Sequence, residues 1–286
     1  MSRMLEADRA AARERPIAVF DSGVGGLTVL HELLVSLPAE DFVYLGDTAR
    51  FPYGDKTQEQ LRAFAVEIAE HLLALDAKLL VVACGSATAA ALPLLQRHLA
   101  ASDVDVLGVI EPAVRLAIDA TRSGRIGLLA TPATVASGAF ADAIALYDRR
   151  ARLQSVSCPD LAPIIQSGFP FDERVVETVR RYTAPLREAE VDTVILGSTH
   201  YPLVAPMLQR MLGRGVRLVT SGQGVARSVE LTLRERDLAT TRDVEGAYRF
   251  HTTGDVEAFR TLGTRFLQMP LGEVERVVLT PTEVPV

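Results

Sequence analysis

Two segments of the sequence are similar to one another, and each places one side chain with an exchangeable proton after an apolar run. Residues 79–88 carry Cys84 and residues 193–201 carry Ser198 at the matching position. A Pro-x-Leu-Gln-Arg run follows each segment, and a gap of one residue aligns both copies. A duplicated unit of this kind would place the two side chains on opposite sides of a small substrate. That arrangement suits proton transfer at both faces of one carbon atom.

Two further side chains are candidates for the same chemistry. Asp21 follows an apolar run and is expected to take up or deliver the proton of Cys84, and His200 is expected to support Ser198. A helix is expected to begin just after Cys84, and its amino end would lower the pKa of the thiol below about 8.5. Cys158 has no such setting and is predicted to be structural.

Apolar runs and helical patterns alternate along the chain. Strands are predicted at residues 17–20, 42–45, 79–83, 106–109, 126–130, 153–156, 191–196 and 217–219, with a later strand and turn at 248–255. Helices are predicted at 27–36, 58–75, 87–100, 112–121, 133–147, 174–188, 205–212, 224–236 and 256–267. Continuous apolar strands separated by helices indicate parallel sheets covered on both faces. We expect an α/β fold of two pseudo-symmetric, doubly wound parallel-sheet domains with the active site between them.

The domain boundaries are expected where the chain crosses between the two halves. Residues 16–110 plus 222–286 would form the first domain, residues 111–221 the second, and residues 1–15 an N-terminal tail. The tail has several arginines but no apolar core, so it does not resemble a signal peptide. The apolar stretch at 79–95 contains glycine, serine and proline and is too short to span a membrane. We expect a cytoplasmic protein.

Composition and motif spacing exclude several functions. Apolar residues make up 48% and charged residues 23%, as in ordinary soluble proteins, and the net charge of −6 argues against nucleic acid as a partner. The glycines at 23, 25 and 26 lack the G-x-G-x-x-G spacing of a nicotinamide-cofactor site. The five histidines lack metal-ligand spacing, and two cysteines cannot form a disulfide framework. No G-x-S-x-G motif surrounds Ser198, which argues against a hydrolase.

The residues that follow the predicted strands indicate the kind of ligand. In open parallel sheets, ligands bind beyond the carboxyl ends of the strands. The residues there are small or hydroxylated, with few lysines and arginines nearby, and include Ser22, Gly85, Ser86 and Thr199. Such a rim suits a compact carboxylate that is held by backbone N–H groups and hydroxyls.

Three motifs resemble the glutamate racemase family of the cofactor-independent aspartate/glutamate racemase superfamily. They lie at residues 17–28, 46–54 and 199–203, and the similarity runs from about residue 16 to residue 267. The resemblance implies interconversion of L- and D-glutamate for peptidoglycan synthesis, without pyridoxal phosphate or metal, by two cysteines that flank the α-carbon. Family members are often homodimers. Matching residues with an implied role in catalysis or substrate binding are Asp21, Ser22, Asp47, Tyr53, Gly54, Thr199 and His200.

The sequence departs from the family pattern at three positions. Gly85 replaces a common asparagine, Gln166 a common glutamate, and Ser198 the second cysteine. A hydroxyl is a much weaker acid than a thiol, so racemisation is expected to be impaired by a factor of roughly 10²–10⁴. Three explanations stay open: an engineered Cys→Ser change, a natural relative that binds an acidic amino acid or performs one-thiol isomerase or decarboxylase chemistry, and a racemase in which a neighbour such as His200 replaces the thiol.

Overall fold

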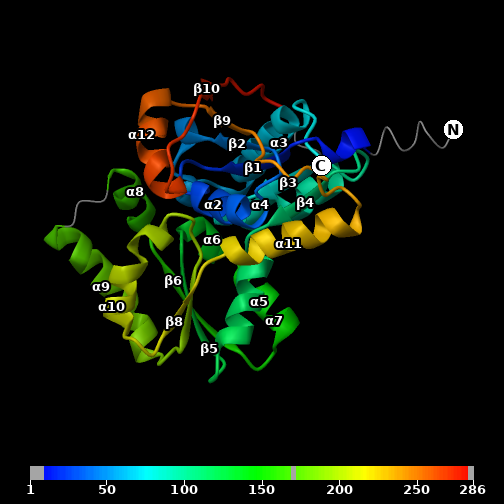
Figure 1. Ribbon diagram of the computed structural model, residues 1–286. Coiled ribbons are helices and arrows are strands. Elements are labelled where there is room, and N and C mark those ends of the chain that lie inside the picture. The colour runs from blue at the N-terminus through cyan, green and yellow to red at the C-terminus, as the bar shows by residue number, and fades with distance from the viewer. Residues whose placement is uncertain (1–9, 169–171, 283–286) are drawn as a thin grey trace.

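The structure is a computed structural model that describes residues 10–168 and 172–282 of the 286-residue chain. Within these residues the strands form two sheets, and Figure 1 shows one sheet in each of two lobes. The larger sheet has the order β10-β9-β2-β1-β3-β4, and the smaller has the order β6-β5-β7-β8. The order β2-β1-β3-β4 therefore recurs as β6-β5-β7-β8, and every neighbouring pair of strands is parallel. The expected pseudo-symmetric α/β architecture is confirmed.

The strands are short, and most of them are buried. The larger sheet contains β1 (Ile17–Asp21), β2 (Phe42–Gly46), β3 (Leu79–Val82), β4 (Asp105–Gly108), β9 (Tyr248–Thr252) and β10 (Val274–Arg276). The smaller sheet contains β5 (Arg125–Ala130), β6 (Arg152–Ser157), β7 (Thr193–Leu196) and β8 (Arg217–Val219).

Helices follow most strands and cover both faces of each sheet. They are α2 (Leu27–Ser36), α3 (Gln58–Leu73), α4 (Gly85–His98), α5 (Ile110–Ala120), α6 (Pro132–Ser137), α7 (Ala139–Tyr147), α8 (Leu161–Gln166), α9 (Glu173–Glu188), α10 (Ala205–Leu212), α11 (Gly222–Glu235) and α12 (Val256–Leu267). Short 3₁₀ turns are η1 (Thr48–Arg50), η2 (Tyr53–Asp55) and η3 (Tyr201–Val204). No helix in the described part of the chain is long and apolar enough to cross a membrane.

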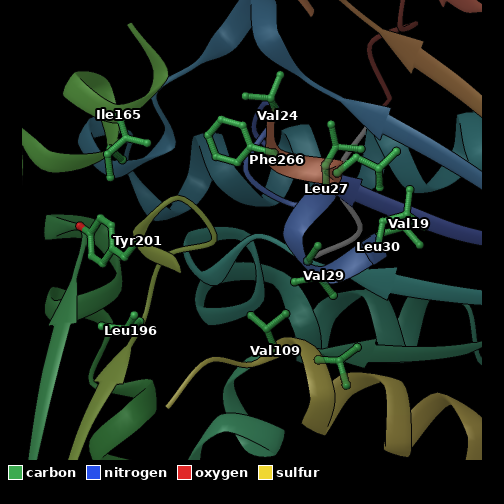
Figure 2. Packing of buried hydrophobic residues seen from close by; sticks show 14 of the residues in the cluster. Val19, Val24, Leu27, Val29, Leu30, Val109, Ile165, Leu196, Tyr201 and Phe266 are labelled. Atoms are coloured by element: carbon green, nitrogen blue, oxygen red, sulfur yellow. The ribbon is translucent and has the colours of Figure 1, made fainter. Parts of the chain in front are cut away.

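Side chains on opposite faces of the larger sheet belong to different apolar clusters. Ile17 and Val19 of β1 pack into a cluster with α2, α11 and α12, whereas Ala18 and Phe20 pack into a cluster with α3 and α4. The first cluster continues into the other lobe, where it includes Leu196 of β7 (Figure 2). The two lobes therefore share one apolar contact surface.

Some predicted elements differ from the structure. The helix expected at 133–147 is split into α6 and α7, because Gly138 has a φ of 74° that ends α6 and begins α7. Helix α8 and strand β10 were not predicted, since one has six residues that include a proline and the other has three.

The N-terminal tail is partly described. Residues 1–9 of the expected tail lie outside the described residues, whereas residue 13 is attached to the body of the first lobe. There the buried Lys78 ammonium donates to the backbone oxygens of Arg13 and Leu238 and pairs with Glu40 at 2.5 Å. The division into residues 16–110 plus 222–286 and residues 111–221 stays a prediction, and it would assign one sheet to each domain.

Candidate active site

A cavity of about 290 Å³ lies at the carboxyl ends of the strands and is lined by residues from both lobes. Cys84 and Ser198 both line it. So do most of the other residues singled out from the sequence, namely Ser22, Tyr53, Gly54, Gly85, Ser86, Thr199 and His200. Asp21 and Asp47 are fully buried and do not belong to its lining.

The two similar segments meet across this cavity. Cys84 follows β3 and is the residue that precedes α4, and Ser198 follows β7 by two residues. Their neighbours Gly85 and Gly197 approach so closely that a Cβ atom added at Gly85 would lie 2.6 Å from the Gly197 carbonyl oxygen. A side chain at position 85 would therefore require the Gly197 backbone to shift. The thiol and the hydroxyl therefore reach one compact space from opposite lobes.

The Cys84 thiol is protonated at neutral pH. Burial, together with the nearby Asp21 carboxylate, raises its pKa to about 12 against the opposing effect of hydrogen bonds from Ala87 and Ser22. The expectation that the amino end of α4 would lower this pKa is therefore wrong. The desolvation of a thiolate with 4% exposure outweighs the favourable helix end.

Asp21 lies directly behind the cavity wall. Its carboxylate accepts hydrogen bonds from the Gly23 backbone N–H at 3.0 Å and from the Thr199 hydroxyl at 3.2 Å. Burial raises its pKa, although the surrounding backbone N–H groups oppose the shift. An acid with a raised pKa next to a thiol is suited to exchange a proton with it.

His200 is buried between aromatic rings. Its ring lies 5.4 Å from that of Phe51 and 5.3 Å from that of Phe266, measured between ring centres. Nε2 is 2.8 Å from Oε1 of Gln166, and Nδ1 faces Gly25, where an added Cβ would lie 2.4 Å away. Burial lowers the pKa of His200 to about 3, so the imidazole is uncharged at neutral pH.

Among the described residues, no side chain forms a hydrogen bond with the Ser198 hydroxyl. Its oxygen accepts a long hydrogen bond of 3.4 Å from the backbone N–H of His200, whose ring nitrogens are directed at Gln166 and Gly25 instead. This geometry gives no support to the explanation in which His200 replaces the missing thiol.

Hydroxyl groups gather on the wall between the two lobes. The Ser86 hydroxyl lies 2.8 Å from that of Thr131 and 3.2 Å from that of Thr134, and these two threonines are 3.0 Å apart. Ser86 and Thr131 line the cavity at the start of α4 and α6. No lysine or arginine belongs to the described lining. The wall is thus suited to hold carboxylates by hydrogen bonds alone.

Asp47 fixes the loop that forms another wall. Its carboxylate pairs with Arg50 at 2.6 Å and accepts hydrogen bonds from the Tyr53 and Thr253 hydroxyls, the latter at 2.7 Å. Arg50 in turn pairs with Glu67 at 2.5 Å. The carboxylate of Asp47 therefore orients Tyr53, which lines the cavity, but Asp47 itself lies behind the lining.

Several lining residues had no catalytic or binding role assigned from the sequence: Phe51, Pro52, Asp55, Thr131, Pro132, Pro159, Ala162, Pro163 and Gly197. Thr131, Pro132 and Gly197 follow predicted strands, where ligands are expected to bind, but no specific role could be assigned to them from the sequence. Pro52 and Pro159 belong to loops, and Ala162 and Pro163 belong to α8, for which apolar patterns give no signal.

Two other features of the described chain bear on ligands. Within it, no group of three or more His, Cys, Asp and Glu residues is placed to hold a metal ion. A larger hollow of about 820 Å³ lies between α5, β8 and α11, and none of the predicted site residues line it.

Comparison with known proteins gives consistent results. The family model described as Asp/Glu/Hydantoin racemase matches residues 27–229. The glutamate racemase of Mycobacterium tuberculosis is 43% identical over 263 residues, which cover 92% of this chain and 96% of that protein. The fold is similar to the glutamate racemase of Bacillus anthracis, with a TM-score of 0.89, 35% identity and coverage of 95% and 100%. It is also similar to the Francisella tularensis enzyme in complex with D-glutamate, with a TM-score of 0.86, 32% identity and coverage of 93% and 98%.

Proposed function

The chain belongs to the Asp/Glu/hydantoin racemase family, and we propose that its reaction is the interconversion of L- and D-glutamate, slowed by the serine at position 198. The observation that carries this proposal is the cavity in which Cys84 and Ser198 approach from opposite lobes. The similar structures from Francisella tularensis and Escherichia coli hold D-glutamate and L-glutamate, respectively. An acidic amino acid of that size fits a cavity of about 290 Å³.

In the proposed complex, hydroxyls and backbone N–H groups hold the two carboxylates of glutamate. Ser22, Ser86 and Thr199 supply hydroxyls, and the start of α4 at Gly85 supplies N–H groups that favour an anion. Tyr53 and Gly54 form the adjacent wall. We propose that Asp47 positions this wall through its hydrogen bond with Tyr53 and does not contact glutamate directly.

Proton transfer begins on the Cys84 side. Asp21 accepts the thiol proton, and the resulting thiolate removes the α-proton, so that the C–H bond breaks and an S–H bond forms. The electron pair is left on the α-carbon and its carboxylate. Inversion requires a proton from the opposite face, where the Ser198 hydroxyl would have to become an alkoxide. Return of the proton from Cys84 requires no such step, so exchange with retention is favoured.

A second candidate function follows from the same serine. Ser198 and the uncharged Gln166–His200 pair are poor acid–base groups, so proton transfer depends on Cys84 at the opposite face. Such a site suits binding of an acidic diacid without racemisation, or one-thiol chemistry. The two candidates differ in whether a second thiol restores inversion.

The Ser198→Cys variant tests the proposed function. We expect it to racemise glutamate at least about 10²-fold faster than the unchanged chain. The assay records the change in optical rotation with time, starting from each pure enantiomer. Ser157→Cys is the matched control, since it adds a thiol at the end of β6 outside the cavity lining. An unchanged rate in Ser198→Cys would favour the binding function.

The remaining proposals concern cellular context. As a glutamate racemase, the protein would supply D-glutamate for peptidoglycan synthesis, and we propose that it does so in the cytoplasm. We also propose a homodimer, which sedimentation equilibrium of the purified protein would distinguish from a monomer.

A further inference from the structure

Gln166 is the polar side chain on which the orientation of His200 depends. It lies at the end of α8 in one lobe, and its Oε1 atom accepts the hydrogen bond of 2.8 Å from the His200 ring. The same oxygen lies beside Gly23 of the other lobe, where an added Cβ would be only 2.8 Å from it. The amide is therefore held in a narrow space between the lobes.

An amide oxygen only accepts hydrogen bonds, so the amide orientation in which Oε1 faces the ring assigns the imidazole proton to Nε2. Nε2 of His200 carries the proton and donates it to Gln166, and Nδ1, which faces Gly25, is left without one. Among the described residues, the aromatic side chains of Phe51 and Phe266 and the hydroxyl of Thr199 also lie near the ring. None of these neighbouring groups carries a charge that could stabilise an imidazolium. The Asp21 carboxylate accepts a hydrogen bond from the Thr199 hydroxyl instead.

We propose that Gln166 is a positioning residue that keeps His200 uncharged and directed away from Ser198, so that this side of the cavity cannot stabilise an anion. The inference rests on the proposed racemase function and concerns its second half. A carboxylate in place of the amide would favour a charged imidazole, because an opposite charge at hydrogen-bond distance stabilises the charged form. With the amide present, burial of the ring prevails and lowers the pKa of His200 to about 3.

This arrangement has a consequence for any thiol at position 198. A thiolate there would lie next to the backbone N–H of His200, within a wall that contains an uncharged ring. The thiolate would lack the cation that lowers the pKa of reactive cysteines. Ser198→Cys alone should therefore recover only part of the two-sided reaction, and Gln166→Glu should add to it.

The test compares Gln166→Glu with Gln166→Met, which has a similar length but neither charge nor acceptor oxygen. The first readout is an NMR titration of the His200 ring in isotope-labelled protein, assigned with the His200→Asn variant. We expect His200 of the unchanged chain to be neutral with its proton on Nε2, and its pKa in Gln166→Glu to rise by roughly one to three pH units. A ring that is charged in the unchanged chain, or that carries its proton on Nδ1, would overturn the inference even if Gln166→Glu does not fold.

The second readout is racemisation of glutamate by the double variants. The racemisation rate of Ser198→Cys with Gln166→Glu should exceed that of Ser198→Cys with Gln166→Met about tenfold or more. The reason is that a rise of one pH unit in the pKa of His200 increases the charged fraction of its ring about tenfold. Equal rates would refute the role of Gln166. Exchange of the α-proton on the Cys84 side is followed in every variant. If α-proton exchange is present but the two double variants racemise glutamate at equal rates, only this inference fails. If α-proton exchange is absent in all variants, the proposed function itself is wrong.

Discussion

Cys84 should react with an alkylating reagent at a rate that rises about tenfold for each pH unit between pH 7 and pH 10. Only the thiolate reacts, and burial raises the pKa of Cys84 to about 12. At pH 8 the thiolate is then about 10⁻⁴ of the population, compared with roughly a quarter for a free thiol with a pKa near 8.5. Alkylation should be about 10³-fold slower than for a free peptide thiol at that pH.

The assay is alkylation by iodoacetamide, quantified for each cysteine peptide by mass spectrometry. Cys84 lines the cavity, so the reagent has access to it, whereas the fully buried Cys158 serves as an internal control for loss of the fold. The presence of glutamate should slow the reaction of Cys84 by occupying the cavity. A rate for Cys84 that levels off near pH 8.5, at the value of a free thiol, would refute the conclusion that burial outweighs the helix end.

Two substitutions test the walls of the cavity. Gly85→Ala should lower kcat/KM for α-proton exchange by roughly 10–100-fold, because its Cβ would force Gly197 away, although alanine is the better helix former. Gly272→Ala, with no atom within 4 Å of the added Cβ, is the control, and equal exchange rates in the two variants would contradict the expected close approach. Asp47→Asn should lower the free energy of unfolding by roughly 2 kcal/mol, since it removes the carboxylate that accepts hydrogen bonds from Arg50 and Thr253, while Arg50 keeps its pairing with Glu67. Denaturant unfolding measures this, and a loss below about 1 kcal/mol would mean that Asp47 does not hold the loop.

Most of the fold could be predicted because its strands are continuous apolar runs. The runs at β1, β3, β5 and β7 are buried on both faces, and such strands have a distinct pattern. β10 escaped prediction because it is a three-residue strand at the sheet edge with exposed polar side chains. The break at Gly138 depends on one backbone angle, which hydrophobic periodicity does not encode.

The candidate site was predictable where residues directly follow strands. Cys84, Ser198 and Thr199 were found in this way and line the cavity together. The apolar wall at Pro159 and Pro163 was not predictable, since it depends on how a short helix packs between the lobes. The pKa of Cys84 was predicted in the wrong direction because the depth of burial is a property of the folded chain.

The most direct test of the account is incubation of the unchanged protein with L-glutamate and D-glutamate separately in D₂O. Loss of the α-proton is followed by NMR and configuration by optical rotation in the same samples. We predict that one enantiomer exchanges its α-proton with retention and far faster than it inverts, through Cys84. Inversion as fast as exchange, or no exchange with either enantiomer, would contradict the assignment of a working Cys84 and an impaired Ser198.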